Sequence, residues 1–276
     1  MNAGFLERMA ESSRLRSKKA KEQLSLEALR SQVDALPPSP GLAFSRRGFD
    51  LIAEIKPRSP SEGRLARGEF SAGDTAREYV AGGAMAISVL TEPGHFGGSL
   101  KLLEDVAAAV PDTPVMRKDF LVEPYQVLEA RLNGAAGVLL IVGMVEDEDT
   151  EAMLATALEL GMFALLEAFD EEQLQRAQRI AERLEAPAGS ALLGMNCRDL
   201  RTLAVDPNRF LRLKLPDRGD YRLYAESGVE DARQAAELAA RGWDGWLMGS
   251  ALMRAHDPRA LAASMLAEAR RNRSGR

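Results

Sequence analysis

The strongest constraint on the fold is a unit that repeats from residue 49 onward, in which an apolar strand is followed by a loop and an amphipathic helix. Eight strand candidates recur along the chain. They span residues 50–56, 84–90, 114–118, 137–142, 162–167, 191–196, 222–226 and 244–248. Alternating β and α units of this number predict an α/β fold of the (β/α)8 TIM-barrel type.

Helical patterns fill the intervals between the strand candidates. They span residues 72–81, 100–109, 124–132, 147–160, 171–184 and 230–241. Ser99 and Asp170 are predicted N-caps, and Gly161 and Gly242 stand where helices should end. An open doubly wound sheet is the alternative, but it usually carries a glycine-rich fingerprint after its first strand, and no G-x-G-x-x-G occurs in this chain.

Residues 1–46 have a different character. Two short helical stripes precede a cluster of prolines, Pro37, Pro38 and Pro40, that stops helical structure. We therefore expect residues 1–46 to form an N-terminal helical extension packed on the barrel, and residues 47–276 to form the barrel that carries the active site. The basic run at residues 14–21 is either a solvated helix face or a cover over a site for an anionic ligand.

Composition narrows the function classes. The single cysteine, Cys197, excludes a disulfide framework and a multi-cysteine zinc site, and two histidines make a histidine-rich metal site a poor expectation. A net charge of −5 argues against a nucleic-acid partner. No apolar run is long enough to cross a membrane, and the N-terminus lacks the apolar core of a secretory signal. The expectation is a cytoplasmic protein without a membrane partner. The oligomeric state stays open, with a monomer as the expectation.

The stretch 51–63 places two opposite charges at the end of the first strand candidate. Glu54 and Lys56 are two residues apart, so both side chains project to the same side of the strand. Buried opposite charges are costly unless they pair or take part in chemistry. They predict either an ion pair that orders the following loop, which includes Ser59 and Pro60, or a catalytic pair.

Unusual polar residues collect at the C-terminal ends of the other strand candidates as well. They are Lys118, Asp119, Glu167, Asn196, Arg198, Glu226, Ser227 and Ser250. Active sites of TIM barrels are built from strand C-termini and the loops that follow. Each residue has a structural alternative, such as ion pairing, helix capping or loop bridging. Their shared position nevertheless predicts one site at that face.

Two small segments indicate a phosphate site. Ser227-Gly228 and Gly249-Ser250 follow the seventh and eighth strand candidates, which is the common phosphate position of this fold. Glycine lets the backbone approach closely, and backbone N–H groups with a short helix from residue 251 would face the anion. No Walker-type lysine follows, so a small phosphorylated metabolite is a better fit than a nucleoside triphosphate.

The charges also indicate a reaction type. Lys56, Lys118 and Arg198 suit a substrate with more than one anionic group. Sites for hard metal ions gather carboxylates without lysines among them. Lysine beside glutamate instead favours general acid–base chemistry on a carbonyl compound, with a Schiff-base lysine as an alternative. The charge pattern therefore predicts a metal-free pocket.

Seven motifs closely resemble the indole-3-glycerol phosphate synthase family of tryptophan biosynthesis, in a monofunctional form. They are IAEIKPRSPSEG (52–63), SVLTEPGHFGGS (88–99), PVMRKDFLVEPYQVLEAR (114–131), LLEAFDEEQL (165–174), GMNCRDLRTLAVD (194–206), AESGV (225–229) and LMGSALMRAHDP (247–258). The resemblance implies a lyase and decarboxylase that uses no metal and no organic cofactor. Its substrate would be 1-(2-carboxyphenylamino)-1-deoxyribulose 5-phosphate, and its products indole-3-glycerol phosphate, carbon dioxide and water.

The resemblance gives five residues a catalytic role. Lys118 would be the general acid that protonates the ketone oxygen during ring closure, and Glu167 the catalytic carboxylate of the dehydration. Lys56, held by Glu54, resembles the lysine that binds the substrate carboxylate. How Lys56 and Lys118 divide the acid roles stays open. Asn196 would bind the anthranilate or hydroxyl side.

The resemblance also implies binding residues. Substrate-binding positions are Ser59, Pro60, Phe96, Phe120, Arg198, Leu200, Glu226, Ser227 and Leu247, and phosphate-binding positions are Ser59, Gly228, Gly249 and Ser250. Three residues depart from the family pattern: Pro57, Phe169 and Cys197. These departures keep an alternative open, a divergent paralogue that binds a phosphorylated metabolite or serves as a subunit of a complex. A sugar-phosphate isomerase of the same barrel group is a third hypothesis.

Overall fold

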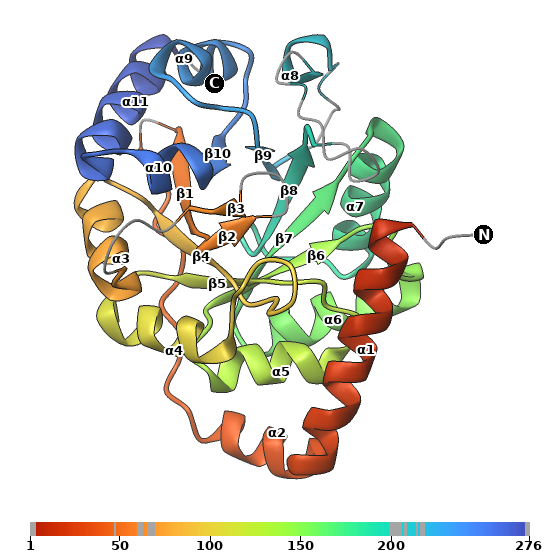
Figure 1. Cartoon of the computed structure of the whole chain (residues 1–276). Coiled ribbons are helices and arrows are strands. Elements are labelled where there is room, and N and C mark those ends of the chain that lie inside the picture. Colours follow the sequence, from red (N-terminus) through yellow and green to blue (C-terminus); the bar gives the residue numbers. More distant parts are fainter. Residues whose placement is uncertain are drawn as a thin grey trace.

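A computed structural model describes residues 4–46, 48–59, 63–65, 70–198, 206, 209–213, 215 and 219–273. Eight parallel strands close into a barrel in the order β1-β10-β9-β8-β7-β6-β5-β4 (Figure 1). The strands are β1 Asp50–Ile55, β4 Ala86–Leu90, β5 Val115–Lys118, β6 Gly137–Ile141, β7 Phe163–Ala168, β8 Ala191–Asn196, β9 Arg222–Glu226 and β10 Gly245–Met248. The predicted (β/α)8 TIM barrel is therefore confirmed, with each strand within two residues of its predicted bounds.

Helices alternate with these strands on the outside of the barrel. They are α3 Ala72–Ala81, α4 Leu100–Ala109, α5 Pro124–Leu132, α6 Asp147–Glu159, α7 Glu171–Arg183, α8 Arg209–Arg212, α9 Ala232–Ala240, α10 Ser250–Arg254 and α11 Pro258–Asn272. The side chains of Ser99 and Asp170 accept hydrogen bonds from Leu102 and Gln173 N–H groups, so both predicted N-caps are confirmed. The sequence analysis did not predict α11, nor the short antiparallel pair β2 Arg58–Ser59 and β3 Gly63–Arg64.

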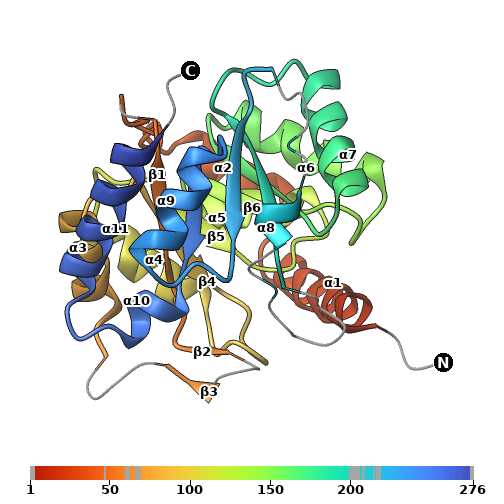
Figure 2. The ribbon, with the colours of Figure 1, turned by 90° about the horizontal axis from the view of Figure 1, so that it is seen from above.

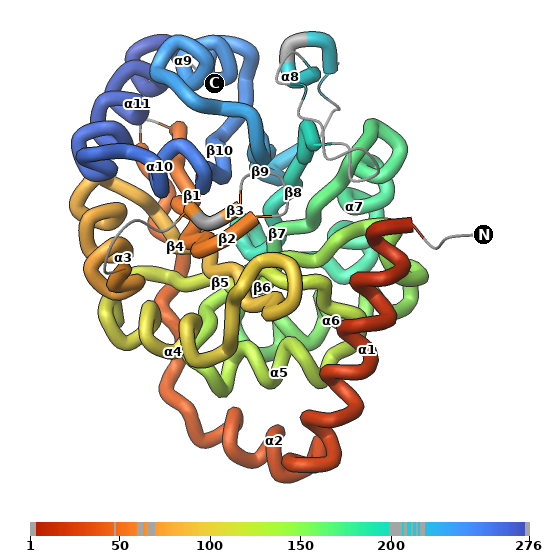
Figure 3. The backbone as a smooth tube through the Cα atoms, in the orientation of Figure 1, coloured from red at the N-terminus to blue at the C-terminus, as the bar shows by residue number. Residues whose placement is uncertain are grey.

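The strands divide their side chains between two apolar layers. Each strand contributes at least one residue to the inner layer, and these include Ile52, Ala86, Met116, Leu139, Leu165, Leu192, Tyr224 and Leu247. Neighbouring strand residues such as Leu51 and Val115 pack outward with the helices. Side chains along a strand alternate between faces, so this pattern fixes which positions point into the barrel. The barrel closes where β1 pairs with β10, and Figure 3 shows these two strands beside each other.

Two helices precede the barrel, α1 Phe5–Gln23 and α2 Leu26–Asp34. In both ribbon views α1 lies on the side of the molecule opposite α3 and α11 (Figures 1 and 2). Leu29 and Val33 of α2 pack against Tyr125 and Leu128 of α5. A division of the chain at residue 46 remains a prediction. None of the helices that the structure describes is long and apolar enough to cross a membrane.

Gly245 is required where the barrel closes. It pairs with Asp50 of β1 and Tyr224 of β9, and a Cβ atom at this position would overlap the Asp50 carbonyl oxygen and the Tyr224 ring. We expect Gly245→Ala to lower the free energy of unfolding by roughly 1–3 kcal/mol, the usual effect of overpacking. Gly41→Ala is the control, because Gly41 is exposed and a Cβ there would meet no atom within 4 Å. Urea midpoints measure both, and equal midpoints would contradict the prediction.

Candidate active site

A cavity of about 370 Å³ opens at the C-terminal end of the barrel strands. It is lined by every predicted site residue that the structure describes, and these are Glu54, Lys56, Ser59, Phe96, Lys118, Phe120, Glu167, Asn196, Arg198, Glu226, Ser227, Gly228, Leu247, Gly249 and Ser250. The two remaining predictions, Pro60 and Leu200, lie outside the described residues. Residues separated by up to about two hundred positions in sequence thus share one cavity.

The two-residue alternation of the strands explains why these side chains meet. Glu54 lies two positions after Ile52, Lys118 two after Met116, and Glu167 two after Leu165. The earlier residue of each pair belongs to the inner apolar layer, so the later one points to the same side, one step nearer the strand's C-terminal end. Glu226 lies two positions after Tyr224 on β9, and Asn196 lies four positions after Leu192 on β8, so both point to the same side as those inner-layer residues. The polar site therefore lies next to the inner apolar layer, on the side of the C-terminal ends of the strands.

Lys118 is at the centre of the charged groups. Its Nζ atom lies 2.8 Å from Glu167 Oε2 and 3.3 Å from Glu226 Oε2. The amide of Asn196 donates to Glu167 Oε1 at 3.0 Å, and the Asn196 side-chain oxygen accepts from the Arg198 backbone N–H at 2.9 Å. One chain of contacts therefore joins the ends of β5, β7, β8 and β9.

Burial and the neighbouring charges have opposite effects on the pKa of Lys118. Burial alone lowers the pKa of Lys118, but the charges of Glu167, Glu226 and Glu54 outweigh it and raise the pKa above the ordinary lysine value. Burial and the Glu167 charge raise the pKa of Glu226 well above its usual range. The carboxyl groups therefore favour the ammonium form of Lys118, and the titration of Glu226 is shifted to higher pH.

Glu54 and Lys56 form the predicted ion pair, with Lys56 Nζ 2.9 Å from Glu54 Oε1. Burial raises the pKa of Glu54, but the charges of Lys56 and Lys118 bring it below the ordinary value, so this carboxylate is ionised. Gly249 leaves the space that Glu54 occupies, because a Cβ atom at residue 249 would overlap Glu54 Oε1. The sequence analysis associated Gly249 with phosphate alone and missed this second reason for a glycine.

Small residues line the side of the cavity where β9 and β10 end. Ser227 and Gly228 both adopt left-handed backbone conformations, with φ of +68° and +71°. For Ser227 this conformation is uncommon, and such strain in non-glycine residues clusters at functional sites. Gly249 and Ser250 begin α10 on the adjoining edge. The predicted phosphate-side residues are thus brought together with Ser59 in one cavity.

Aromatic side chains form the opposite wall. The ring centroids of Phe96 and Phe120 lie 6.1 Å apart, and Phe5 packs edge-on against Phe120 at 5.9 Å. Phe5 comes from α1, so the extension contributes to the cavity lining. No signal in the sequence singled out Phe5. Leu139 and Ile141, by contrast, were recoverable from the alternation along β6, although the sequence analysis did not name them as site residues.

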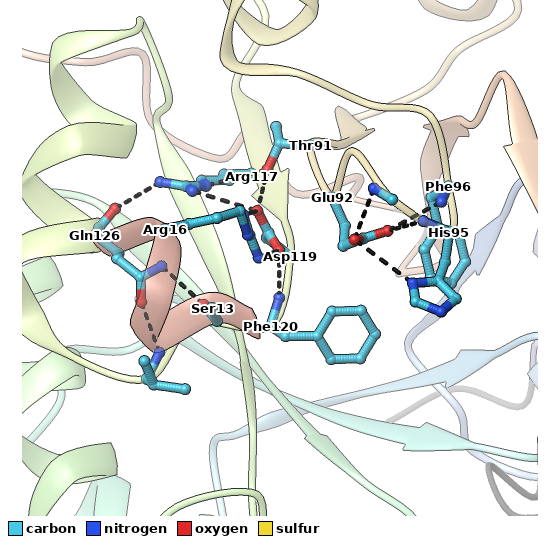
Figure 4. Close-up of polar contacts among 12 residues, drawn as sticks. Ser13, Arg16, Thr91, Glu92, His95, Phe96, Arg117, Asp119, Phe120 and Gln126 are labelled. Atoms are coloured by element: carbon cyan, nitrogen blue, oxygen red, sulfur yellow. Dashed lines mark hydrogen bonds and ion pairs between the residues drawn. The ribbon is translucent and has the colours of Figure 1, made fainter. Parts of the chain in front are cut away.

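Asp119 also lines the cavity, and its carboxylate forms ion pairs with Arg16 and Arg117 (Figure 4). Cys197 is buried in the outer apolar layer, and burial raises the pKa of its thiol to about 12, which is the behaviour of an inert cysteine. Within the ranges that the structure describes, no three His, Cys, Asp or Glu side chains gather as metal ligands.

Comparisons with known proteins identify the family of this chain. The family model for indole-3-glycerol phosphate synthase matches residues 6–265. An indole-3-glycerol phosphate synthase of a Nocardioides species is 45% identical over 235 residues, covering 84% of this chain and 85% of the relative. The enzyme of the same name from Micrococcus luteus is 46% identical over 209 residues, covering 75% of this chain and 74% of the relative.

Solved structures with low sequence identity share the fold alone. A 3-hexulose-6-phosphate synthase from Salmonella typhimurium superimposes with a TM-score of 0.64 at 16% identity, covering 81% of this chain and all of that one. A thiamine phosphate pyrophosphorylase from Pyrococcus furiosus reaches 0.53 at 17% identity, covering 82% and 97%. The barrel, the grouping of charged residues at its C-terminal end and the near-complete family match lead to one conclusion: the chain belongs to the indole-3-glycerol phosphate synthase family.

Proposed function

We propose that this chain closes the indole ring of 1-(2-carboxyphenylamino)-1-deoxyribulose 5-phosphate by general acid–base catalysis. The reaction yields indole-3-glycerol phosphate, carbon dioxide and water, so the enzyme is a carboxy-lyase of tryptophan biosynthesis. The observation that carries the assignment of roles is the position of Lys118. Its ammonium lies within hydrogen-bonding distance of two buried carboxylates at the centre of the cavity.

The proposed substrate matches the distribution of charge in the cavity. It carries a carboxylate, a ketone and a phosphate, and the cavity offers the cationic side chains of Lys56, Lys118 and Arg198 together with small residues after β9 and β10. Lys56 and Arg198 suit the carboxylate, and Gly228, Gly249 and Ser250 suit the phosphate. Phe96, Phe120 and Leu247 would hold the aromatic ring.

Ring closure is assigned to Lys118. The aromatic carbon that bears the carboxylate attacks the ketone carbon, a carbon–carbon bond forms, and the ketone oxygen takes a proton from the Lys118 ammonium. Carbon dioxide then leaves, and the electron pair of the broken bond restores the aromatic ring. A raised lysine pKa keeps the proton available throughout the neutral range.

Dehydration completes the indole. The new hydroxyl leaves as water with a proton from Lys56, and Glu167 accepts the proton lost from the neighbouring ring carbon. Asn196 holds the Glu167 carboxylate through its amide, so Glu167 presents its other oxygen to Lys118. No step of this sequence requires a metal or an organic cofactor. A cytoplasmic location and a monomeric state are part of the proposal.

A non-catalytic binder of a phosphorylated metabolite is the second candidate. Pro57, Phe169 and Cys197 depart from the family pattern, and this is the observation that favours it. None of them contributes a side-chain contact to the chain of hydrogen bonds around Lys118. A binder has no need for an ammonium held between two carboxylates, so the acid–base proposal is preferred.

The first prediction concerns Lys118. We expect Lys118→Met to lower kcat by roughly 10²–10⁴-fold, because the ketone oxygen loses its proton donor. The measurement is the rise of indole fluorescence with 1-(2-carboxyphenylamino)-1-deoxyribulose 5-phosphate, with a chelator present. Lys101→Met is a control, since Lys101 is an exposed lysine on α4. Normal turnover of Lys118→Met would remove the residue from its role, and binding without turnover in the unmodified chain would favour the binder.

A second prediction concerns the space around Glu226. A Cβ atom on Gly194 would overlap Glu226 Oε1, so Gly194→Ala should displace this carboxyl from Lys118. We expect kcat to fall by roughly tenfold or more, as for other small misplacements of reacting groups. In a chain that already carries Glu226→Ala, the added Gly194→Ala should have little further effect on kcat. Independent, multiplying effects of the two changes would contradict this account.

A third prediction concerns pH. The pKa of Glu226 is raised above its ordinary value of 4.5, so the folded protein holds a proton that the unfolded chain releases. This contribution to stability is complete below pH 4.5 and is lost as the pH rises. Glu226→Gln has no carboxyl group to titrate at this position. The urea midpoint of Glu226→Gln, relative to that of the unmodified protein, should therefore rise as the pH increases from 5 to 8. A constant difference across that range would show that Glu226 has an ordinary pKa.

A further inference from the structure

We propose that Arg16 of α1 is a positioning residue, which acts through Asp119 to hold the end of β5 and with it Lys118 and Phe120. The inference rests on the proposed function and extends it to a side chain outside the barrel. Arg16 belongs to the basic run at residues 14–21. From sequence, this run could be either a solvated helix face or a cover over the site.

The Asp119 carboxylate accepts hydrogen bonds from four residues (Figure 4). Arg16 donates to both of its oxygens, with each distance 2.8 Å. Thr91 Oγ1 donates at 2.7 Å and Arg117 at 3.3 Å. The backbone N–H of Phe120 donates at 2.8 Å. The Asp119 carboxylate is fully buried, and this many donors leave it one favourable position. Asp119 therefore fixes the backbone of Lys118 and Phe120 on either side of it.

Thr91 connects this carboxylate to the backbone of Lys118. Its own N–H donates to the carbonyl oxygen of Lys118 at 3.0 Å, and its hydroxyl donates to Asp119. The end of β5 is therefore held from β4 on one side and from α1 on the other. Lys118 and Phe120, the neighbours of Asp119 in sequence, both line the cavity.

Arg16 supplies the charge that Asp119 needs. Arg117 is the other cation, but it is shared, because it also lies 2.8 Å from Glu129. Without Arg16, the two carboxylates would share one buried arginine. Burial alone would raise the pKa of Asp119, yet Arg16 and Arg117 hold it at about 2. Loss of Arg16 would leave a poorly compensated charge, which relaxes only by moving or by taking up a proton.

The same face of α1 makes the neighbouring contacts. Ser13 accepts a hydrogen bond from Gln126 at 2.9 Å, and Met9 packs in the inner apolar layer with Phe120. Phe5 packs against the Phe120 ring itself. These residues recur every three to four positions, as one helix face requires. Arg16 is thus part of a docked surface rather than a solvated basic run.

The chain offers a matched control on the same helix. Lys21 of α1 pairs with Glu123, which precedes α5, and both side chains are partly exposed. This pair also joins α1 to the segment after β5, but it makes no contact with Asp119, Thr91 or Lys118 in the hydrogen bonds described. Lys21→Met therefore removes a comparable ion pair without disturbing the buried carboxylate.

The experiment compares Arg16→Met with Lys21→Met in the indole-fluorescence assay. We expect Arg16→Met to lower kcat by roughly 10–100-fold and to raise KM by a smaller factor, because Phe120 shifts together with Lys118 while the anion-binding residues lie on other strands. Lys21→Met should keep both constants. Arg16→Lys should recover part of kcat, because one charge-assisted hydrogen bond is restored. Equal losses in the two Met variants, an unchanged kcat, or a rise in KM alone would each overturn the proposal.

Two further measurements test the route through Asp119. Thr91→Val removes the hydrogen bond from the Thr91 hydroxyl to the Asp119 carboxylate. Its effect on kcat should be less than multiplicative with that of Arg16→Met. Independent effects would contradict a shared route through Asp119. Thr91→Val also serves if Arg16→Met does not fold. Hydrogen exchange over residues 118–122 needs no turnover, and it should rise in Arg16→Met but not in Lys21→Met. If the unmodified chain does not turn over, the proposed function fails, while this exchange comparison still decides the role of Arg16.

Discussion

A buried ammonium inside a barrel needs nearby negative charge or hydrogen-bond acceptors. Much of this site is arranged to supply them to Lys118. Lys118 lies between Glu167 and Glu226, Asn196 holds Glu167, and a glycine on β8 leaves room for Glu226. Each of these groups is costly to bury by itself and becomes tolerable only in the presence of the others. The same compensation keeps a proton on the lysine at neutral pH, which is what an acid catalyst of ring closure needs.

The location of TIM-barrel active sites made most of this predictable. Once eight strands were found, the polar residues at their C-terminal ends indicated the site, because active sites of this fold are built there. That rule places Glu54, Lys118, Glu167, Asn196 and Glu226 without any knowledge of distances. Strand bounds were equally accessible because buried parallel strands read as short apolar runs between helical patterns.

Features that depend on distant packing were not predictable in the same way. Phe5 lines the cavity only because α1 docks beside β5, and docking of a helix is not encoded in its own periodicity. The reason for a glycine at residue 249 depends on where the Glu54 carboxylate ends up, which is a property of two strands together. The basic run was ambiguous because one helix can carry both exposed lysines and a partly buried arginine. Pro60 and Leu200 lie outside the described residues, so their predicted roles remain predictions.

The contact between Arg16 and Asp119 spans 103 residues, and this has a consequence for how the chain folds. During synthesis α1 emerges long before β5, so its apolar face and its arginine have no partner while the first strands are being made. An isolated helix of this kind is marginal in water, and non-local contacts are the slow ones to form. The wall of the cavity next to Lys118 is therefore completed by the segment that was made first but ordered late. Assembly of the site is in this sense coupled to the overall topology of the chain, and not to the barrel alone.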